Sequence, residues 1–335
     1  MSIAVIGSGS WGTALSVLLS RNGYDVKLWG HKKKHVNQLL IDRENKIYLP
    51  GILFPENLSP EFELKAAVQG ANLVVMVVPS HGFRDVFLKV FPFLEPNCRL
   101  VSAVKGIENE SLLTMTQVMA EVLGGAGEIV KNIEIGVLSG PSFAKEVAMC
   151  LPTAVTIGFK NLQTAIEIQK IFTNEYFRVY ASRDVVGLEV SAALKNVIAI
   201  AAGVCEGLGY GLNTRAALIT RGLAEIRRLG NRLNADDATF SGLSGMGDLI
   251  LTCTGDLSRN RTVGISLGKG KKLKEIVDEM SMVAEGIKTT KSAYDLATRL
   301  KIEMPILEQV YQIIYKNKEC SLAVRDLLKR ESKVE

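Results

Sequence analysis

Hydrophobic residues follow two different patterns along the chain. In the first half, short and nearly continuous apolar runs alternate with helix-length segments, which is typical of parallel strands covered by helices on both faces. We predict strands at residues 3–6, 25–29, 73–78, 100–104 and 133–138, and we expect residues 153–158 and 177–180 to extend the same sheet.

From Ser182 onward, the apolar positions recur with the period of an α-helix. Helices are predicted at residues 185–208, 214–233, 273–280, 289–300 and 305–315. The pattern indicates an α/β protein, with the domain boundary near residues 182–184. A doubly wound, mostly parallel sheet is expected in residues 1–183, and an all-helical domain in residues 184–335.

The composition is that of a globular protein of ordinary charge. Of its 335 residues, 47% are hydrophobic and 22% are charged, and the formal net charge of +5 comes without a long run of lysine or arginine. These values favour neither disorder nor nucleic-acid binding, and they suit a small anionic substrate.

The five cysteines are scattered, odd in number and form no C-x-x-C pair. We therefore expect free thiols and a cytoplasmic location rather than a disulfide framework or a zinc site. The apolar N-terminus has no basic segment and is interrupted by glycine and serine, so no signal peptide is predicted. We expect no membrane-spanning helix, because no apolar run approaches the ~18 residues that one needs.

The first predicted strand runs directly into GSGSWG, residues 7–12, and then into an apolar helix. In this motif Gly7 permits the tight turn and Gly9 lets the backbone approach a pyrophosphate. Gly12 allows close packing of the helix, whose N-terminus faces the phosphates. The position of the motif between a strand and a helix predicts a Rossmann-type dinucleotide-binding domain.

The second predicted strand ends near the basic sequence HKKKH, residues 31–35, where an NAD-selective site carries an acidic residue for the ribose 2′-hydroxyl. His31, Lys32 and the two lysines that follow can neutralise a 2′-phosphate, so NADP is expected to be accepted beside NAD. A solvated basic loop is the alternative. Three lysines between the two histidines would oppose a cation, and we predict no metal site.

Lys195 is the only cationic residue in the apolar segment EVSAALKNVIAIAAG, residues 189–203. Its helical neighbours at three and four residues, Ser191, Ala192, Ile198 and Ala199, include no carboxylate. If this face is buried, the partner of the ammonium group must come from elsewhere in the fold or from a ligand.

Three further segments carry polar groups at expected loop positions. Lys105 follows a predicted strand in VSAVKGIE, and Gly140 and Ser142 follow another in LSGPSFAKE, at the edge where open α/β sheets bind ligands. A solvated lysine and a structural turn are the alternatives. Glu285 precedes a helix in VAEGIKTT, where a helix cap and a cofactor contact both fit.

The segment SGLSGMGDLILTCTGDLSRNRT, residues 241–262, holds the densest polar cluster of the second domain. Asp248 follows three glycines and is either a helix N-cap or the partner of Lys195. Ser258 is predicted to cap a helix that starts at Arg259. This helix N-terminus, with the side chains of the SRNR sequence, has the properties of a phosphate site.

Together these motifs resemble the NAD(P)-dependent glycerol-3-phosphate dehydrogenases of the bacterial type, over nearly the whole chain. The resemblance rests on GSGSWGTAL from Gly7, VKGIE from Val104, SGPSFAKE from Ser139, ALKNVIAIAAG from Ala193, GDL from Gly247 and SRNR from Ser258. It implies that the protein interconverts sn-glycerol 3-phosphate and dihydroxyacetone phosphate with NAD or NADP. It also implies a homodimer and a supply of glycerol 3-phosphate for phospholipid synthesis.

The resemblance further implies roles for individual residues. The lysine that matches Lys195 donates and accepts the proton, with Lys105 and Asp248 beside the reacting carbon. The substrate is bound by these three and by the residues that match Gly140, Ser142, Thr252, Ser258, Arg259 and Asn260. The cofactor is contacted by the residues that match Gly7, Gly9, Ser10, Trp11, Gly12, His31, Lys32, Lys105, Ala144, Arg259, Val283 and Glu285.

The resemblance suggests a chemical reason for the charge on Lys195. When hydride reaches C2 of the ketone, its ammonium group can stabilise the charge on the carbonyl oxygen and donate a proton. Burial lowers the pKa of a lysine and a nearby Asp248 raises it, and the sequence leaves the balance open.

Two alternatives remain at this stage. A β-hydroxy acid or sugar-acid dehydrogenase of the same architecture also uses a lysine on a helix. A non-catalytic NAD(P)-binding sensor would instead keep Lys195 as a buried structural cation. The SRNR helix start implies a phosphate, which favours a phosphorylated substrate over a hydroxy acid.

Overall fold

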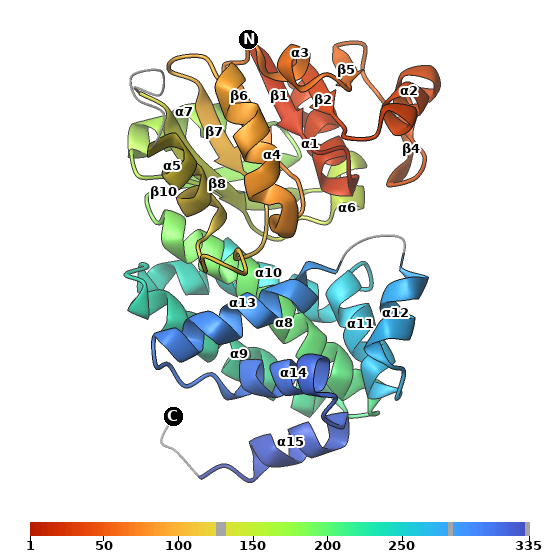
Figure 1. Ribbon diagram of the computed structural model, residues 1–335, viewed down its shortest axis with the longest axis vertical. Coiled ribbons are helices and arrows are strands. Elements are labelled where there is room, and N and C mark those ends of the chain that lie inside the picture. The colour runs from red at the N-terminus through yellow and green to blue at the C-terminus, as the bar shows by residue number, and fades with distance from the viewer. Residues whose placement is uncertain (125–131, 281–283, 332–335) are drawn as a thin grey trace. The chain divides into compact units, whose positions relative to one another are not determined.

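The computed structural model describes residues 1–124, 132–280 and 284–331. By the contacts between residues, the chain divides into two units, Met1–Val104 with Thr114–Leu188, and Lys105–Leu113 with Glu189–Glu335 (Figure 1). The division after Leu188 lies slightly beyond the boundary expected from the sequence. The segment Lys105–Leu113 also differs from the expectation, because its contacts place it in the second unit.

An eight-stranded sheet forms the centre of the first unit, in the order β10-β9-β8-β7-β6-β1-β2-β5. Its strands are β1 (Ser2–Ile6), β2 (Asp25–Trp29), β5 (Leu58–Glu61), β6 (Leu73–Met76), β7 (Arg99–Ser102), β8 (Glu134–Ser139), β9 (Thr153–Phe159) and β10 (Phe177–Ser182). Neighbouring strands are parallel except for β8 and β9, which run antiparallel. The predicted mostly parallel sheet is confirmed, and every predicted run forms one of its strands.

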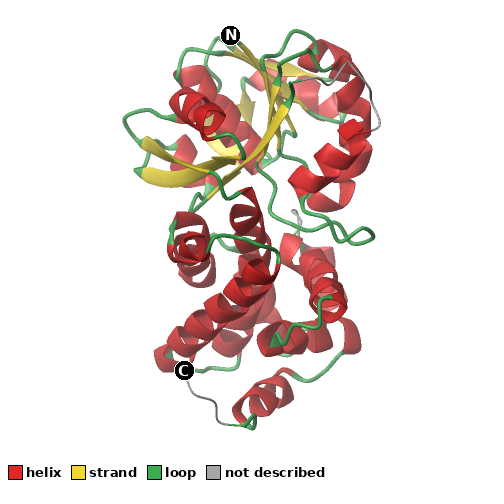
Figure 2. Cartoon of the chain, turned by 90° about the vertical axis from the view of Figure 1, so that its left-hand side faces the viewer, coloured by secondary structure: helices red, strands yellow, loops and turns green. Residues whose placement is uncertain are grey.

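Helices lie on either side of this sheet (Figure 2). They are α1 (Ser10–Arg21), α2 (Lys33–Asp42), α3 (Leu64–Val68), α4 (Phe83–Val90), α5 (Met115–Gly124), α6 (Ala144–Ala148) and α7 (Leu162–Phe172). Helix α1 contacts β1 and β2, and its Leu15 and Leu19 join Ile3, Val5 and Val75 of the strands in one fully buried core. The strand order reverses between β6 and β1, and sheets of this kind bind ligands outside the carboxyl ends of the strands at such a point.

The sequence prediction missed three strands of the first unit. Strands β3 (Glu44–Asn45) and β4 (Leu49–Leu53) form a separate antiparallel pair, and β5 lies at the edge of the main sheet. Strand β4 contains Pro50 and Gly51, and β5 contains Pro60. Proline has no backbone N–H to donate to a strand ladder and is confined mainly to edge strands, so these segments lack the usual signal of a strand.

The second unit contains no strand among its described residues, and the predicted helical domain is confirmed (Figure 2). Its helices are α8 (Val185–Gly207), α9 (Leu212–Arg232), α10 (Asp248–Thr254), α11 (Arg259–Gly268), α12 (Leu273–Glu279), α13 (Glu285–Arg299), α14 (Pro305–Lys316) and α15 (Cys320–Leu328). The short helix α10 and the C-terminal α15 were not predicted.

Helix α8 is the central helix of this unit. Contrary to the expectation from the sequence, it is long and apolar enough to cross a membrane, but 94% of its most apolar window is buried inside the protein, as in a core helix. Glycines let it contact α11 backbone to backbone: a Cβ atom on Gly203 would lie 2.1 Å from the Arg261 carbonyl oxygen, and one on Gly264 would lie 2.1 Å from that of Ile200. This close approach brings the SRNR sequence beside the helix that carries Lys195.

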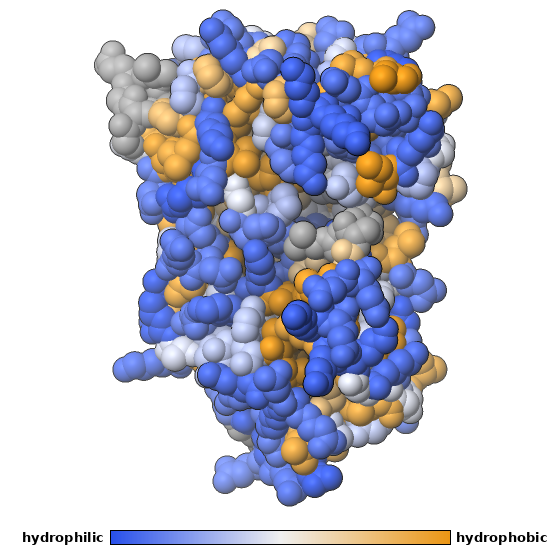
Figure 3. Space-filling model, turned by 45° about the vertical axis from the view of Figure 1, so that its right-hand side comes forward, coloured by the Kyte–Doolittle hydropathy of each residue, from blue (hydrophilic) through white to orange (hydrophobic). Residues whose placement is uncertain are grey.

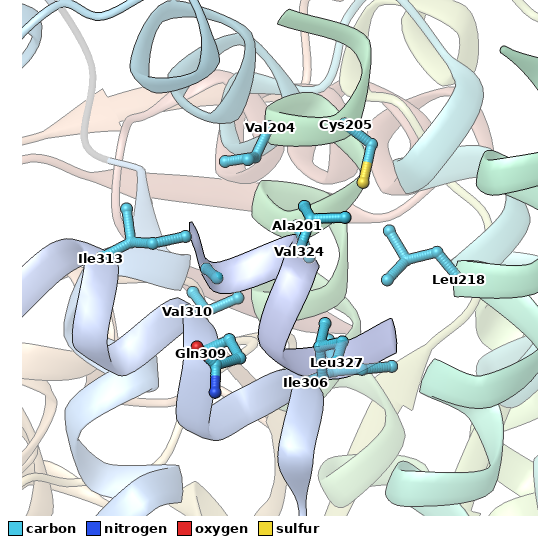
Figure 4. A pocket seen from close by; sticks show the side chains of 11 residues that line it. Ala201, Val204, Cys205, Leu218, Ile306, Gln309, Val310, Ile313, Val324 and Leu327 are labelled. Carbon is cyan, nitrogen blue, oxygen red and sulfur yellow. The ribbon is translucent and has the colours of Figure 1, made fainter. Parts of the chain in front are cut away.

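A small apolar pocket of about 20 Å³ lies between α8, α9, α14 and α15 (Figure 4). Ala201 and Cys205 of α8 face Leu218 of α9 and Val310 of α14 across it, and Gln309 supplies an amide among otherwise apolar side chains. A water needs two to four polar partners, so this pocket is expected to stay dry. It is a packing gap rather than a ligand site.

Hydrophilic residues predominate on the face shown in Figure 3, and hydrophobic ones lie there in small groups. The large apolar side chains with the highest exposure in the first unit include Ile41 at 76% and Leu53 at 69%. Exposed apolar side chains are common on protein surfaces and do not by themselves indicate an interface.

Candidate active site

Lys195 lies near the middle of α8, where every residue from 187 to 205 is buried. Only 5% of its surface is exposed. The partner that its burial requires comes from α10, because its Nζ atom donates to Oδ1 of Asp248 at 2.6 Å and to Oγ1 of Thr252 at 2.6 Å. The hypothesis that Asp248 is the partner of Lys195 is therefore confirmed.

Asp248 and Thr252 are four residues apart and share one face of α10. The Thr252 hydroxyl donates to the backbone carbonyl of Asp248 at 2.6 Å while it accepts from Lys195. Asp248 is the first residue of the helix rather than its N-cap, which is Gly247. Its carboxylate is therefore free of a capping role and points to the two lysines.

A π-helical turn (η5, Leu243–Gly247) leads into α10 and sets the position of Asp248. Gly245 is required there, since a Cβ atom would lie 2.2 Å from the Phe240 carbonyl oxygen. The glycine-rich sequence before Asp248 thus forms a turn too tight for other residues.

Lys105 completes the cluster, which we call the lysine–aspartate cluster: Lys105, Lys195, Asp248 and Thr252. The Nζ atom of Lys105 donates to Oδ2 of Asp248 at 2.8 Å, so one carboxylate bridges two ammonium groups. The Asp248 side chain is 1% exposed and that of Lys105 is 18% exposed. Lys105 can therefore meet solvent or a ligand, while Asp248 cannot.

Burial has the largest effect on the pKa of Lys195. It lowers this pKa from 10.5 to about 7. The charge of Asp248 and its hydrogen bond raise this pKa, and the nearby charge of Lys105 lowers it. The amine is consequently placed to exist in both protonation states near neutral pH.

The SRNR sequence opens α11 as predicted. Ser258 is the N-cap, and its Oγ atom accepts from the backbone N–H of Arg261 at 3.3 Å. Asn260 is 7% exposed, and its Oδ1 atom accepts from the backbone N–H of Gly286 at 2.9 Å. Since Gly286 is in the first turn of α13, this bond ties the N-termini of two helices together.

Arg259 and Glu285 lie at these two helix starts. Burial lowers the pKa of Arg259, and the charge of Glu285 raises it. Glu285 is the first residue of α13, whose N-cap is Ala284. The paired helix N-termini and the Arg259 guanidinium form a favourable place for an anion.

We expected the SRNR side chains to bind a phosphate together. The Arg261 guanidinium is instead paired with carboxylates of the protein. It donates to both carboxylate oxygens of Glu206, at 3.0 and 2.8 Å, and to Asp256 at 2.9 Å. These ion pairs tie α11 to α8. Glu206 shows no local sequence signal for this role, because it lies 55 residues from Arg261 in the chain.

The glycine loop of the first unit has the geometry that a dinucleotide site requires. Gly7 has φ +128°, and a Cβ atom on Gly12 would lie 1.8 Å from the Gly7 carbonyl oxygen. A Cβ atom on Gly9, in contrast, would meet nothing within 4 Å. Gly9 is also the N-cap of α1 and has no side chain to occupy the first-turn N–H groups, which suits a pyrophosphate.

Two neighbours of this loop were expected to contact the cofactor. The Ser10 hydroxyl donates to the Tyr48 carbonyl oxygen at 2.6 Å. The indole nitrogen of Trp11 is buried and has no hydrogen-bond partner among the described residues. The residues present therefore fit a bound dinucleotide.

The basic sequence after β2 lies at the start of α2. His31 and Lys32 are exposed, and the helix begins at Lys33 with no acidic residue in its first turn. A positive helix end with several lysines favours a bound anion.

The turn after β8 was also predicted to be a site. Gly140 has φ +144°, and a Cβ atom there would lie 2.8 Å from Cα of Val155. Ser142 donates to the Gly140 carbonyl oxygen at 2.9 Å, and Ala144 begins α6. Val283, another expected cofactor contact, lies outside the described residues.

Comparison with known proteins shows the family to which the chain belongs. A model of the N-terminus of NAD-dependent glycerol-3-phosphate dehydrogenase matches residues 2–165, and a model of its C-terminus matches residues 184–325. The chain belongs to this family.

Individual relatives agree with this family. A glycerol-3-phosphate dehydrogenase [NAD(P)+] of Desulfotalea psychrophila is 62% identical over 334 residues, which is 100% of this chain and 98% of the relative. The crystal structure of a glycerol-3-phosphate dehydrogenase from Coxiella burnetii has 39% identity and a TM-score of 0.93, and the match covers 98% of this chain and 99% of that one.

The fold also occurs outside the family. A ketopantoate reductase structure from Ralstonia eutropha matches with a TM-score of 0.61 at 15% identity, over 98% of this chain and 100% of that one. At this identity the likeness concerns the fold alone. The hydroxy-acid alternative thus shares the architecture, whereas the family models and the 62% identical relative assign this chain to the glycerol-3-phosphate dehydrogenases.

Proposed function

We propose that the enzyme interconverts sn-glycerol 3-phosphate and dihydroxyacetone phosphate by hydride transfer with NAD or NADP, and that Lys195 exchanges the proton. The observation that carries the proposal is the buried ammonium group of Lys195, held 2.6 Å from both a carboxylate and a hydroxyl, in a chain of this family. The nicotinamide ring of the cofactor supplies the hydride in ketone reduction and takes it up in alcohol oxidation.

Lys195 acts on the oxygen at C2 of the substrate. During reduction, its ammonium group donates a proton to that oxygen as negative charge develops there. During oxidation, the neutral amine accepts the hydroxyl proton. The pKa of about 7 supports both directions, because neither protonation state is rare at neutral pH.

Asp248 and Lys105 assist this step electrostatically. Asp248 keeps the protonated form of Lys195 accessible despite its burial, and it orients Nζ through the 2.6 Å bond. Lys105 is more exposed and carries a second positive charge that can stabilise the developing oxyanion. Thr252 accepts from a second of the three ammonium hydrogens, which leaves the third for the substrate oxygen, and we propose that Thr252 is itself a substrate contact.

We assign the substrate phosphate to the start of α11. Arg259 and Asn260 would bind it there, at the positive N-terminus of the helix that Ser258 caps. Gly140 and Ser142 of the first unit are the further substrate contacts that we propose. Anchoring the phosphate fixes the position of the carbonyl group, which lowers the entropic barrier to reaction.

We assign the dinucleotide to the loop of Gly7, Gly9 and Gly12, with Ser10 and Trp11 as neighbours. His31 and Lys32 would face the ribose, and their charge supports acceptance of the 2′-phosphate of NADP beside NAD. The other cofactor contacts that we propose are Lys105, Ala144, Arg259, Val283 and Glu285.

The proposal extends to the cellular role. A soluble cytoplasmic homodimer that supplies glycerol 3-phosphate for phospholipid synthesis agrees with the family assignment and with the burial of α8 inside the second unit. Size-exclusion chromatography with light scattering tests the dimer, and a monomeric mass would contradict it.

Lys195→Met tests the catalytic role. General acid–base groups contribute about 10²–10⁴-fold, so kcat for dihydroxyacetone phosphate should fall by about that factor. NADPH binding should survive, because the glycine loop belongs to the first unit. Lys291→Met is the matched control: Lys291 also lies in the second unit, but its side chain is 48% exposed and pairs with Asp295. Full turnover in the folded Lys195 variant would refute the proposal.

A further inference from the structure

We propose that Asn45 is a positioning residue of the dinucleotide site, which holds the glycine loop in its binding shape and so sets cofactor affinity without taking part in turnover. The inference rests on the proposed function, in which this loop binds the pyrophosphate. Asn45 belongs to strand β3, in a segment that the sequence analysis did not single out. We call residues 44–53, which include β3 and β4, the strap.

Asn45 is fully buried, with 0% of its surface exposed, and all parts of its amide group are used. Its Nδ2 atom donates to the Ser8 carbonyl oxygen at 3.0 Å and to Oγ1 of Thr13 at 2.8 Å. Its Oδ1 atom accepts from the backbone N–H of Tyr48 at 3.2 Å. One side chain therefore joins the strap to the glycine loop and to the first helical turn behind it.

The two acceptors flank, in the chain, the segment 9–12 to which we assign the pyrophosphate. Ser8 stands between Gly7 and Gly9, and Thr13 closes the first turn of α1 through its backbone N–H bond to the Gly9 carbonyl at 2.9 Å. Both residues are bound to the same amide nitrogen, so the bend of the loop and the start of the helix are held together. This fixes the direction of the first-turn N–H groups, which are the donors for a phosphate.

The strap makes further contacts to the same region. The Tyr48 carbonyl oxygen accepts from the Ser10 hydroxyl at 2.6 Å. The Tyr48 ring meets the His35 ring edge to face at a centroid distance of 5.4 Å. Since His35 lies in the first turn of α2, the strap contacts both the pyrophosphate loop and the basic helix start.

The glycines of the loop give it a conformational freedom that a residue outside the loop must restrict. The loop contains glycine at three of its six positions, and glycine retains more backbone freedom than any other residue. A loop with this freedom binds a ligand tightly only if the protein has already restricted it. Asn45 supplies that restriction from outside the loop.

The experiment measures NADPH affinity and steady-state kinetics of Asn45→Ala in the full-length enzyme. Trp11 belongs to the loop, so the quenching of tryptophan fluorescence by NADPH reports binding without turnover. We expect the Kd and the KM for NADPH to rise about tenfold, because two buried acceptors lose their donor. The kcat and the KM for dihydroxyacetone phosphate should stay unchanged.

Asn57→Ala is the matched control. Asn57 also donates two side-chain hydrogen bonds to α1 and its flank, to the carbonyl oxygens of Ser20 at 2.9 Å and Tyr24 at 2.7 Å, but at the opposite end of the helix. Its loss should lower the melting temperature without changing the Kd for NADPH. The comparison separates a positioning role from a general contribution to stability.

Asn45→Asp is the second variant, because it keeps the volume but replaces the donor amide by a carboxylate. We expect it to weaken NADPH binding more than Asn45→Ala, since it adds negative charge beside the pyrophosphate position. Unchanged NADPH affinity in either folded Asn45 variant would overturn the proposal. Equal losses of NADPH affinity in Asn45→Ala and Asn57→Ala would also overturn it. Failure of both Asn45 variants to fold would also overturn it, because Asn45 would then serve the fold alone.

These outcomes are distinct from a failure of the proposed function. If the wild-type enzyme bound NADPH but did not reduce dihydroxyacetone phosphate, the catalytic proposal would fail, while the fluorescence comparison of Asn45 and Asn57 variants would still test the positioning role.

Discussion

The substitution Asp248→Asn tests how the lysine–aspartate cluster controls the proton on Lys195. It keeps the size of the side chain and removes its charge. In the wild-type protein, Asp248 raises the pKa of Lys195 through its charge and its hydrogen bond, and Lys105 lowers it. Without the carboxylate, Lys195 faces only burial and a second cation, so its pKa must fall below the wild-type value of about 7.

The magnitude follows from the geometry of the pair. The 2.6 Å bond joins a lysine that is 6% exposed in its side chain to an aspartate that is 1% exposed. A hydrogen bond to a charged group is worth about 1.5–3 kcal/mol, and one pKa unit is about 1.4 kcal/mol, so the pKa should fall by about one to two units. At pH 7 the protonated fraction then drops from about one half to about 1–10%, and ketone reduction slows about 5- to 50-fold.

The assay is the pH dependence of kcat for reduction of dihydroxyacetone phosphate at saturating NADPH. The midpoint of the high-pH limb should move to lower pH in Asp248→Asn. Glu225→Gln is the control, because Glu225 is another buried carboxyl of the second unit, 3% exposed, which caps the start of α14 through the backbone N–H groups of Ile306 and Leu307. A midpoint that stays in place or rises in Asp248→Asn would refute the reasoning.

Four further predictions follow from the same structure. Because reduction needs protonated Lys195 and oxidation needs its neutral form, kcat should fall for reduction and rise for oxidation as the pH increases through about 7; parallel profiles in the two directions would exclude Lys195 as the shared proton carrier. Arg259→Met should raise the KM for dihydroxyacetone phosphate about 10- to 100-fold, since it removes charged hydrogen bonds to the phosphate. Arg261→Met should instead lower the free energy of unfolding in urea by about 2 kcal/mol, because it breaks partly buried ion pairs. An increase in KM for the Arg261 variant alone would reverse the two assignments. Among the thiols, partly exposed Cys150 should react with a disulfide reagent in the native protein. Cys205, whose pKa is raised to about 11 by burial, should react only after unfolding, and its rapid modification in the native state would contradict the described packing.

Much of the fold is visible in the sequence because its strongest signals are local. Strands β1 and β6 are continuous apolar runs, and the GSGSWG motif follows β1 directly. Strands β4 and β5 escaped prediction because Pro50 and Pro60 interrupt them, and their pairing depends on neighbours distant in sequence. The place of Lys105 in the second unit likewise depends on a contact with Asp248, 143 residues away.

The candidate site is likewise visible in the sequence only in part. The sequence indicated that Lys195 needs a partner, because an unpaired cation is costly in an apolar helix. It did not distinguish the role of Arg259 from that of Arg261, since only the fold shows that Arg261 is already paired with carboxylates. Asn45 carried no signal at all, because an asparagine in a polar segment looks like an ordinary turn residue.

The most direct test of the central claim is the oxidation of NADPH and, separately, of NADH at 340 nm with dihydroxyacetone phosphate, with unphosphorylated dihydroxyacetone as the comparison. We predict turnover with the phosphorylated ketone alone, and activity with both cofactors. No turnover with either cofactor from the folded protein, or equal turnover of the two ketones, would contradict the assignment of Lys195 and Arg259 to a phosphorylated substrate.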